Sequence, residues 1–278
     1  MRAFRIAYDG RPYYGFQRQP DVPTVEGTLF DALRALDVFA GGKPAGYAAA
    51  GRTDAGVSAL AQTVAFEAPD WLTPRALNSE LPGTVRAWAS VDVPGGFHAT
   101  HHATERRYTY HLHAPEADVT LAREVLDQLS GQHDFHNLTP DSDGTSRELD
   151  ADLAHDDPFL VLTFSAGGFA RQLVRRLVSL VAGVARGDRP RADVDRVLAP
   201  EPLDGPRGIA PASAQPLVLA DVIYGESEVL SEPLSFDVDA EAARSARDVF
   251  ERMRLEHVTA SRVAGQLTAG IDGSLADR

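Results

Sequence analysis

The sequence predicts an α/β (α+β) fold made of two similar halves around a cleft. Strand-like and helix-like segments alternate along the chain, and the same alternation occurs in both halves. The chain has 278 residues, of which 44% are hydrophobic, so it can bury a sizeable core. These observations favour one or two mixed α/β domains.

In the first half, the sequence predicts a strand at 3–10, a helix at 24–36, a buried strand at 60–68, a short helix at 73–83 and further strands at 85–93 and 105–114. The first strand alternates in hydropathy and ends at Asp9-Gly10, which is typical of a turn. Thr24 and Thr73 stand where an N-cap is expected, and Pro74 occupies the first position of the short helix. Each element therefore has its own start signal.

In the second half, the sequence predicts a helix at 120–131, two paired strands at 148–155 and 159–166, and a long amphipathic helix at 169–187. A short helix at 192–199 and a closing strand at 215–225 follow. After residue 226 the composition becomes acidic and helical, as in residues 239–258. We predict an N-terminal subdomain at 1–105, a C-terminal subdomain at 106–225 and a helical extension at 226–278.

The composition excludes several classes of protein. The chain has no cysteine, so disulfides, thiol catalysis and thiolate metal sites are ruled out. It has no apolar run of about 18 residues and no signal-peptide order at its start, so we expect a cytoplasmic protein without a membrane partner.

The charge balance is unusual. The net charge is −13, and Lys43 is the only lysine beside 26 arginines. A strongly acidic protein would repel nucleic acid in dilute buffer. The alternative is that the acidity is a surface adaptation to very high salt, where such repulsion is screened and local arginine clusters decide what binds.

The stretch AAAGRTDAGVSALAQ, residues 48–62, carries Arg52 and Asp54 between two glycines. An ionised carboxylate at a fixed angle can act as a nucleophile, and a nearby arginine keeps it ionised. Gly51 and Gly56 would free the backbone for a sharp turn and for the close approach of a ligand. The alternative is an ordinary Asp-Ala-Gly turn with a solvated ion pair.

Two further stretches carry candidate site residues. In RRYTYHL, Tyr108 and Tyr110 share one strand face and could stack on a nucleobase or pack in the core, while Arg106 and Arg107 could hold phosphates or lie in solvent. In FARQLVRRLV, a helix would place Arg171 and Arg175 four residues apart, on one face, beside Arg176. The alternative for the second stretch is a core helix with a solvated basic edge.

Metal and nucleotide sites have little support. His133 and His136 could bind a metal with Asp134, but no second ligand set lies close in the sequence. No GxxxxGK[ST] or strand-linked GxGxxG motif occurs, so we expect no metal and no nucleotide cofactor.

Six segments, in order, carry a family resemblance: YDGRPYYGFQRQPDVPTVEGTL, AGRTDAGVSALAQ, ALNSELPG, FHATHHATERRYTY, GQHDFHNL and GGFARQLVRRLV. Over about residues 2–225 the chain resembles the TruA family of tRNA pseudouridine synthases, in a form that suggests a halophilic archaeon. The resemblance implies a pseudouridine synthase fold, with antiparallel sheets flanking a basic cleft, and a homodimer. It also implies cofactor-free isomerisation of uridine in the anticodon arm of tRNA, at positions 38, 39 or 40.

The resemblance implies roles for individual residues. Asp54 matches the catalytic nucleophile, Arg52 the residue associated with flipping out the target base, Tyr108 the residue that stacks on the uracil, and Arg175 the partner of the aspartate. We further expect Arg171, Arg176 and Arg107 to contact the substrate, the first two through phosphates.

The chain departs from the family pattern at three places. Ser58 replaces a usual histidine, residues 100–102 lack a usual arginine, and the connection at 113–119 looks short. Two rival functions stay open at this point: an RNA-binding relative without catalysis, and a histidine-dependent metal hydrolase.

Overall fold

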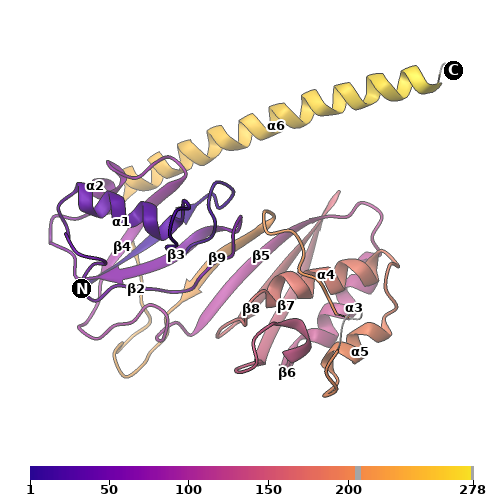
Figure 1. The fold of residues 1–278 in the computed structure, drawn as a ribbon, viewed down its shortest axis with the longest axis horizontal. Coiled ribbons are helices and arrows are strands. Elements are labelled where there is room, and N and C mark those ends of the chain that lie inside the picture. Colours follow the sequence, from indigo (N-terminus) through magenta and orange to yellow (C-terminus); the bar gives the residue numbers. More distant parts are fainter. Residues whose placement is uncertain (204–207, 277–278) are drawn as a thin grey trace.

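One sheet of ten strands crosses both halves of the chain (Figure 1). The computed structural model describes residues 1–203 and 208–276, and the strands lie in the order β10-β4-β1-β3-β9-β5-β8-β7-β6, with β2 beside β3. The strands are β1 (Arg2–Tyr8), β2 (Ala48–Ala49), β3 (Ser58–Phe66), β4 (Val85–Asp92), β5 (Glu105–His113), β6 (Gly131–Asp134), β7 (Ser146–Asp156), β8 (Phe159–Ala166), β9 (Leu217–Ile223) and β10 (Asp237–Val238).

The closing strand β9 joins the two halves of the sheet. β1 pairs antiparallel with β3 and β4, and β8 pairs antiparallel with β5 and β7. Between these groups, β9 runs parallel to β3, with Ser58 opposite Val218, and antiparallel to β5. The predicted α/β class and the predicted pairing of β7 with β8 are confirmed, whereas the division at residues 105 and 225 stays a prediction.

The helices are α1 (Val25–Ala35), α2 (Pro74–Asn78), α3 (Val119–Leu129), α4 (Leu173–Ala185), α5 (Ala192–Leu198) and α6 (Ala240–Ala276), with a 3-10 turn at His136–Leu138. Both predicted caps form, because Thr24 Oγ1 accepts the Gly27 N–H at 3.2 Å and Thr73 Oγ1 accepts the Ala76 N–H at 3.1 Å. None of the described helices is long and apolar enough to cross a membrane.

The long amphipathic helix begins later than predicted. The apolar pattern predicted residues 169–187, but α4 starts at Leu173, and Gln172 has a left-handed φ of 61°. Asp141 accepts the backbone N–H of Arg171 at 2.7 Å, which ties this segment to another loop. Phe169 and Arg171 therefore lie in a loop, and the expectation that Arg171 and Arg175 share a helix face is wrong.

Two hydrophobic cores lie against the sheet. One contains α3 and α4 packed on β5, β7 and β8, with Leu126, Leu162 and Leu177 fully buried. The other contains α1 packed on β1 and β3, with Phe4, Leu33 and Phe66 fully buried. Leu219 and Val222 of β9 belong to this second core, so the end of the second half completes the core of the first.

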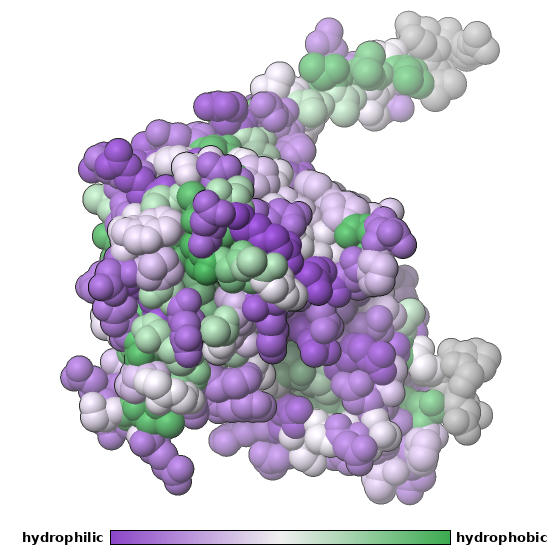
Figure 2. All heavy atoms as spheres, turned by 60° about the vertical axis from the view of Figure 1, so that its left-hand side comes forward, coloured by the Kyte–Doolittle hydropathy of each residue, from purple (hydrophilic) through white to green (hydrophobic). Residues whose placement is uncertain are grey.

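The extension is helical only from residue 240: strand β10 pairs with β4 first, and α6 then runs well beyond the predicted end at residue 258. Its first turns pack on β4 and α2, and the rest stands away from the body of the molecule (Figures 1 and 2). Ala242 and Ala246 are buried in the packed part.

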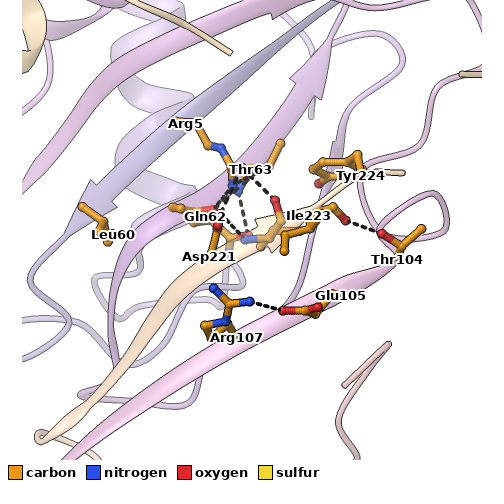
Figure 3. A network of polar contacts seen from close by, with 12 residues as sticks. Arg5, Leu60, Gln62, Thr63, Thr104, Glu105, Arg107, Asp221, Ile223 and Tyr224 are labelled. Atoms are coloured by element: carbon orange, nitrogen blue, oxygen red, sulfur yellow. Dashed lines mark hydrogen bonds and ion pairs between the residues drawn. The ribbon is translucent and has the colours of Figure 1, made fainter. Parts of the chain in front are cut away.

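A buried arginine holds β1, β3 and β9 together (Figure 3). Arg5 donates to the Ala61 carbonyl at 3.0 Å, to Thr63 Oγ1 at 3.2 Å and to the Val222 carbonyl at 2.7 Å, and it pairs with Asp221 at 3.1 Å. Burial lowers the pKa of Arg5, and Asp221 opposes that shift. The junction between the two halves of the sheet is thus fixed by polar contacts.

Candidate active site

The loop that carries Asp54 lies between β2 and β3 and is tied to the turn after β1. The Phe16 N–H donates to the Thr53 carbonyl at 3.0 Å, and the Gly56 N–H donates to the Tyr13 carbonyl at 3.3 Å. Gly56 has a φ of 83°, a conformation that favours glycine. At Gly51 the φ is not positive and a Cβ would meet open space, so this glycine is not required by the turn itself.

The residue before Asp54 anchors the loop. Thr53 is buried, and its hydroxyl lies 2.8 Å from the Tyr8 hydroxyl. Burial raises the pKa of Tyr8, so its proton stays available for this hydrogen bond. Gln62 Nε2 donates to the Gly51 carbonyl at 2.9 Å on the other side of the loop. These contacts therefore fix the backbone of the loop on both sides of Arg52, next to Asp54.

Asp54 pairs with Arg175, which comes from the first turn of α4. Arg175 Nη1 lies 2.8 Å from Asp54 Oδ2, and Arg175 Nε donates to the Ala212 carbonyl at 2.7 Å. The Arg175 side chain is 17% exposed and that of Asp54 is 34% exposed. One carboxylate oxygen is thus engaged, while the group as a whole stays within reach of a ligand.

Tyr108 lies on the wall of the same cleft as Asp54. Its ring meets the Phe169 ring edge-on, with centroids 5.2 Å apart and planes at 90°. Burial, opposed by Arg106 and assisted by Asp54, raises the pKa of Tyr108 to about 12, so the phenol is neutral near pH 7. Tyr110 is 3% exposed and packs in the core, which is the second of the two possibilities considered for this residue.

The cleft has a volume of about 1540 Å³ and is lined by both halves of the chain. Its charged lining residues are Arg18, Lys43, Arg52, Arg171 and Arg175 together with Glu26, Asp54 and Asp141. Cations outnumber carboxylates here, although the chain as a whole carries a net charge of −13. The charge of the cleft is therefore opposite in sign to that of the whole protein and suits a polyanion.

Arg52 and Arg171 differ in how they are held. Arg52 is exposed in the cleft, and its guanidinium makes no hydrogen bond or ion pair with the residues that the structure describes. Arg171 also lines the cleft, but it pairs with Asp141 at 3.2 Å. Arg52 can thus bind a ligand without first giving up a protein partner.

Arg107 and Arg176 are not among the described residues that line the cleft. Arg107 donates to Glu105 at 2.7 Å and to Ser165 Oγ at 3.2 Å, and Figure 3 shows it turned toward Glu105. Arg176 donates to the Ile209 carbonyl at 2.5 Å. The structure does not bring these two predicted contact residues to Asp54, and their contact with substrate stays a prediction.

The sequence alone did not identify Arg106 as a support of the site. Arg106 is 9% exposed and donates to the carbonyls of Ala50 at 2.8 Å, Thr100 at 2.6 Å and Gly167. It clamps three loops around the cleft, and burial lowers its pKa. Arg106, Tyr108 and Tyr110 are alternate residues of one strand and therefore share a face. This spacing is the sequence signal that could have indicated a position for Arg106 beside Tyr108.

Two of the departures from the family pattern make hydrogen bonds with other segments of the chain. Ser58 Oγ accepts the Gly10 N–H at 3.1 Å, and Thr100 Oγ1 donates to the Ala49 carbonyl at 2.5 Å. His98 and His101, whose ring centroids lie 4.2 Å apart, line the cleft. Within residues 1–203 and 208–276, no group of three or more acidic or histidine side chains could hold a metal ion.

Comparison with known proteins places the chain among the tRNA pseudouridine synthases. The sequence profile of that family matches residues 125–225. "tRNA pseudouridine synthase A" of Natronomonas pharaonis is 59% identical over 96% of this chain and 99% of its own length. Its counterpart in Halobacterium salinarum is 56% identical over 96% and 98%, and that in Methanosarcina acetivorans is 38% identical over 81% and 85%.

The two relatives from haloarchaea extend the similarity beyond residue 225, because the 4% of this chain left uncovered is smaller than the segment 226–278. They also support the predicted halophilic origin. A solved archaeal box H/ACA Nop10–Cbf5 complex is similar over 63% of this chain and 44% of that one, at 17% identity and a TM-score of 0.33, which is too slight to bear on function. On the strength of its curated relatives, the chain belongs to the tRNA pseudouridine synthase A family, and it is an isomerase.

Proposed function

We propose that this enzyme converts uridine to pseudouridine in the anticodon stem-loop of tRNA, at positions 38, 39 or 40, with Asp54 as the nucleophile. The observation that carries the proposal is the Asp54–Arg175 pair, which stands beside Tyr108 on the wall of a cationic cleft. A cleft of this charge in an acidic protein supports a polyanionic substrate. The reaction uses no cofactor and no metal.

The target base must leave its stack before the chemistry, at a cost of a few kcal/mol. Arg52 is exposed in the cleft and could brace the vacated space. Tyr108 would stack on the flipped uracil, in the place where its ring now meets Phe169. Arg171 and Arg176 would contact phosphates, and Arg107 would contact another part of the substrate.

The chemical step needs a nucleophile that attacks and leaves without a proton transfer of its own. The Asp54 carboxylate attacks the ribose C1′, and the bond between C1′ and uracil N1 breaks. The uracil rotates and its C5 bonds to C1′ while the carboxylate departs. The C5 proton is then lost to solvent and N1 gains a proton. Arg175 would stay paired with Asp54, and Tyr108 would keep the detached ring close enough for recombination.

The alternative attack of Asp54 on uracil C6 uses the same residues.

We further propose that the enzyme acts in the cytoplasm as a homodimer, with subdomains at residues 1–105 and 106–225 and an extension at 226–278.

The test is a pseudouridine map of an unmodified tRNA transcript after incubation with wild type, Asp54→Ala or Asp54→Asn in molar potassium chloride. We expect wild type to modify the anticodon arm, and both variants to fold and bind tRNA but lose activity by a factor on the order of 10⁴. Turnover by either variant near the wild-type rate would refute the role of Asp54. Binding of tRNA without modification by wild type would favour the non-catalytic RNA-binding alternative.

Tyr108 has a matched pair of variants in the same assay. If stacking is its main role, Tyr108→Phe keeps most of the activity and Tyr108→Leu loses more. Equal losses in the two variants would assign the role to the hydroxyl.

A further inference from the structure

A second, smaller cavity opens beside the cleft of the active site. It has a volume of about 320 Å³, which is at the lower end of the range for cavities that bind small ligands. Arg52, Tyr108 and Phe169 line both cavities, whereas Arg106 and Arg147 line the smaller one alone. We call the smaller cavity the side pocket.

The side pocket differs from the cleft in its charge. Its charged lining residues among those that the structure describes are three arginines, Arg52, Arg106 and Arg147, and none of the three pairs with a described carboxylate. Cations gathered without an anion repel one another, and a cation in a poorly solvated site costs free energy that an anion would recover. Burial lowers the pKa of Arg106, as such a site predicts. The lining therefore favours an anionic ligand.

Arg147 is held in place by neutral groups. Its Nε donates to the Gly168 carbonyl at 2.7 Å, and its Nη1 donates to the Ser146 carbonyl at 2.6 Å. Nη2 makes no hydrogen bond with the described part of the chain. Because carbonyl groups do not neutralise the guanidinium, Arg147 can donate to an anion without first giving up a protein contact.

Glycines keep the side pocket open. At Gly168 an added Cβ would meet nothing nearer than Arg106 Nη1 at 4.0 Å, apart from its chain neighbours, and at Gly51 it would meet nothing within 4 Å. Neither glycine has a φ in the left-handed region, so the backbone does not require glycine at these positions. Both line the side pocket, and their missing side chains leave room for a ligand.

We propose that the side pocket binds a phosphodiester group of the RNA next to the flipped uridine, with Arg147 as its hydrogen-bond donor. The inference rests on the proposed stacking of uracil on Tyr108. This ring lines both cavities, so the backbone beside a nucleotide stacked on it comes within reach of the pocket. A free anion such as inorganic phosphate shares this chemistry, and the experiments separate the two.

The first experiment measures the Kd for an unmodified tRNA transcript over a series of molar potassium chloride concentrations. The parent enzyme is Asp54→Asn, so the RNA stays unconverted and the result does not depend on which uridine reacts or how. Adding Arg147→Gln should raise the Kd about tenfold, the size typical of losing one charge-assisted hydrogen bond. It should also reduce the slope of log affinity against log salt by about 1.

The matched control is Arg186→Gln in the same parent. Arg186 donates to the His113 carbonyl at 2.7 Å and forms no ion pair with a described carboxylate, but it lines neither cavity. This control should bind tRNA as the parent does. A Kd and salt slope for Arg147→Gln equal to those of its parent, or equal changes in the control, would overturn the proposal.

The second experiment fills the side pocket without removing a cation. Gly168 lines the side pocket but is not among the described residues that line the cleft, so Gly168→Leu should weaken tRNA binding about tenfold without lowering the melting temperature. Gly95→Leu is the control, because a Cβ at Gly95 also meets open space and its φ is not left-handed. Unchanged affinity for tRNA in Gly168→Leu would overturn the proposal and would leave a free anion as the ligand.

The third experiment locates the phosphate. Neutral methylphosphonates replace, one at a time, the phosphates on the two sides of the modified uridine in a tRNA ligated from synthetic fragments. At one position the replacement should weaken binding to the Asp54→Asn parent about tenfold and have little effect once Arg147→Gln is added, because both changes remove the same contact. Additive losses at every position would overturn the proposal.

Discussion

Cations in and beside the cleft differ in what holds them. Arg106 and Arg175 are fixed by protein atoms, the first by three loop carbonyls and the second by Asp54 and the Ala212 carbonyl. Arg52 and Lys43 line the same cleft and make no hydrogen bond or ion pair with the described residues. The fixed arginines therefore build the site, whereas the free cations are available to the substrate.

The largest expected effect concerns the fold. Arg106→Leu removes one buried cation and leaves several carbonyls without a donor, which we expect to cost about 3 kcal/mol of unfolding free energy. A thermal melt should show a fall of roughly 10 °C.

The control for Arg106 is its neighbour on the opposite strand face. Arg107→Leu removes a side chain that is 43% exposed and should lower stability by less than about 1 kcal/mol. Equal losses in the two variants would contradict the assignment of Arg106 as a clamp.

The next effect concerns the chemistry. Arg175→Gln leaves Asp54 without its cation, and we expect kcat to fall by about 100-fold, the size typical of losing one electrostatic contact in an active site. Stability should change by about 1 kcal/mol or less, because both partners are partly exposed. The adjacent Arg176→Gln should leave kcat unchanged. A fall in kcat for Arg176→Gln equal to that for Arg175→Gln would remove the distinction between the two arginines.

The third prediction concerns a buried tyrosine, Tyr224. Burial raises the pKa of Tyr224 to about 12, and its hydroxyl donates to the Ala99 carbonyl at 2.9 Å. Above pH 10 the unfolded chain releases this proton while the folded chain retains it. The contribution to stability is therefore complete below pH 10 and is lost as the pH rises toward 12, by about 2 kcal/mol.

Denaturant unfolding at pH 9 and pH 11.5 checks this prediction. Tyr224→Phe should be less stable than wild type at pH 9, because it loses the hydrogen bond, but should lose less stability as the pH rises. Tyr14→Phe, at an exposed tyrosine, is the control and should follow wild type. Identical pH dependence in wild type and Tyr224→Phe would show that this phenol does not contribute.

How far the sequence predicts this site depends on the range of the contacts. The caps at Thr24 and Thr73 involve residues three apart, and both were predicted from the local pattern. The approach of Asp54 to Arg175 spans 121 residues, and only the family resemblance indicated it. No periodicity in either segment specifies that distance.

The start of α4 shows the opposite case. The spacing of Phe169 and Leu173 suits a helix, yet Asp141, 30 residues earlier, binds the Arg171 N–H, and Gln172 turns left-handed. Arg106 escaped prediction for the same reason, since its partners lie in three separate loops. Local propensity could not predict contacts that the tertiary fold creates.

The smallest expected effect tests the free cations. Lys43 is the only lysine of the chain, is exposed and lines the cleft. If it contacts an RNA phosphate, Lys43→Ala should raise KM for tRNA about threefold, leave kcat unchanged and reduce the slope of log affinity against log salt by about 1.

The control is Arg254→Ala, on the exposed surface of α6, where the arginine already pairs with Glu251 at 2.7 Å. A fall in kcat for Lys43→Ala would move this lysine into the fixed group. An unchanged KM and salt slope would mean that Lys43 lies free in the cleft without contacting the substrate. The absence of a protein partner would then not identify the cations that bind RNA.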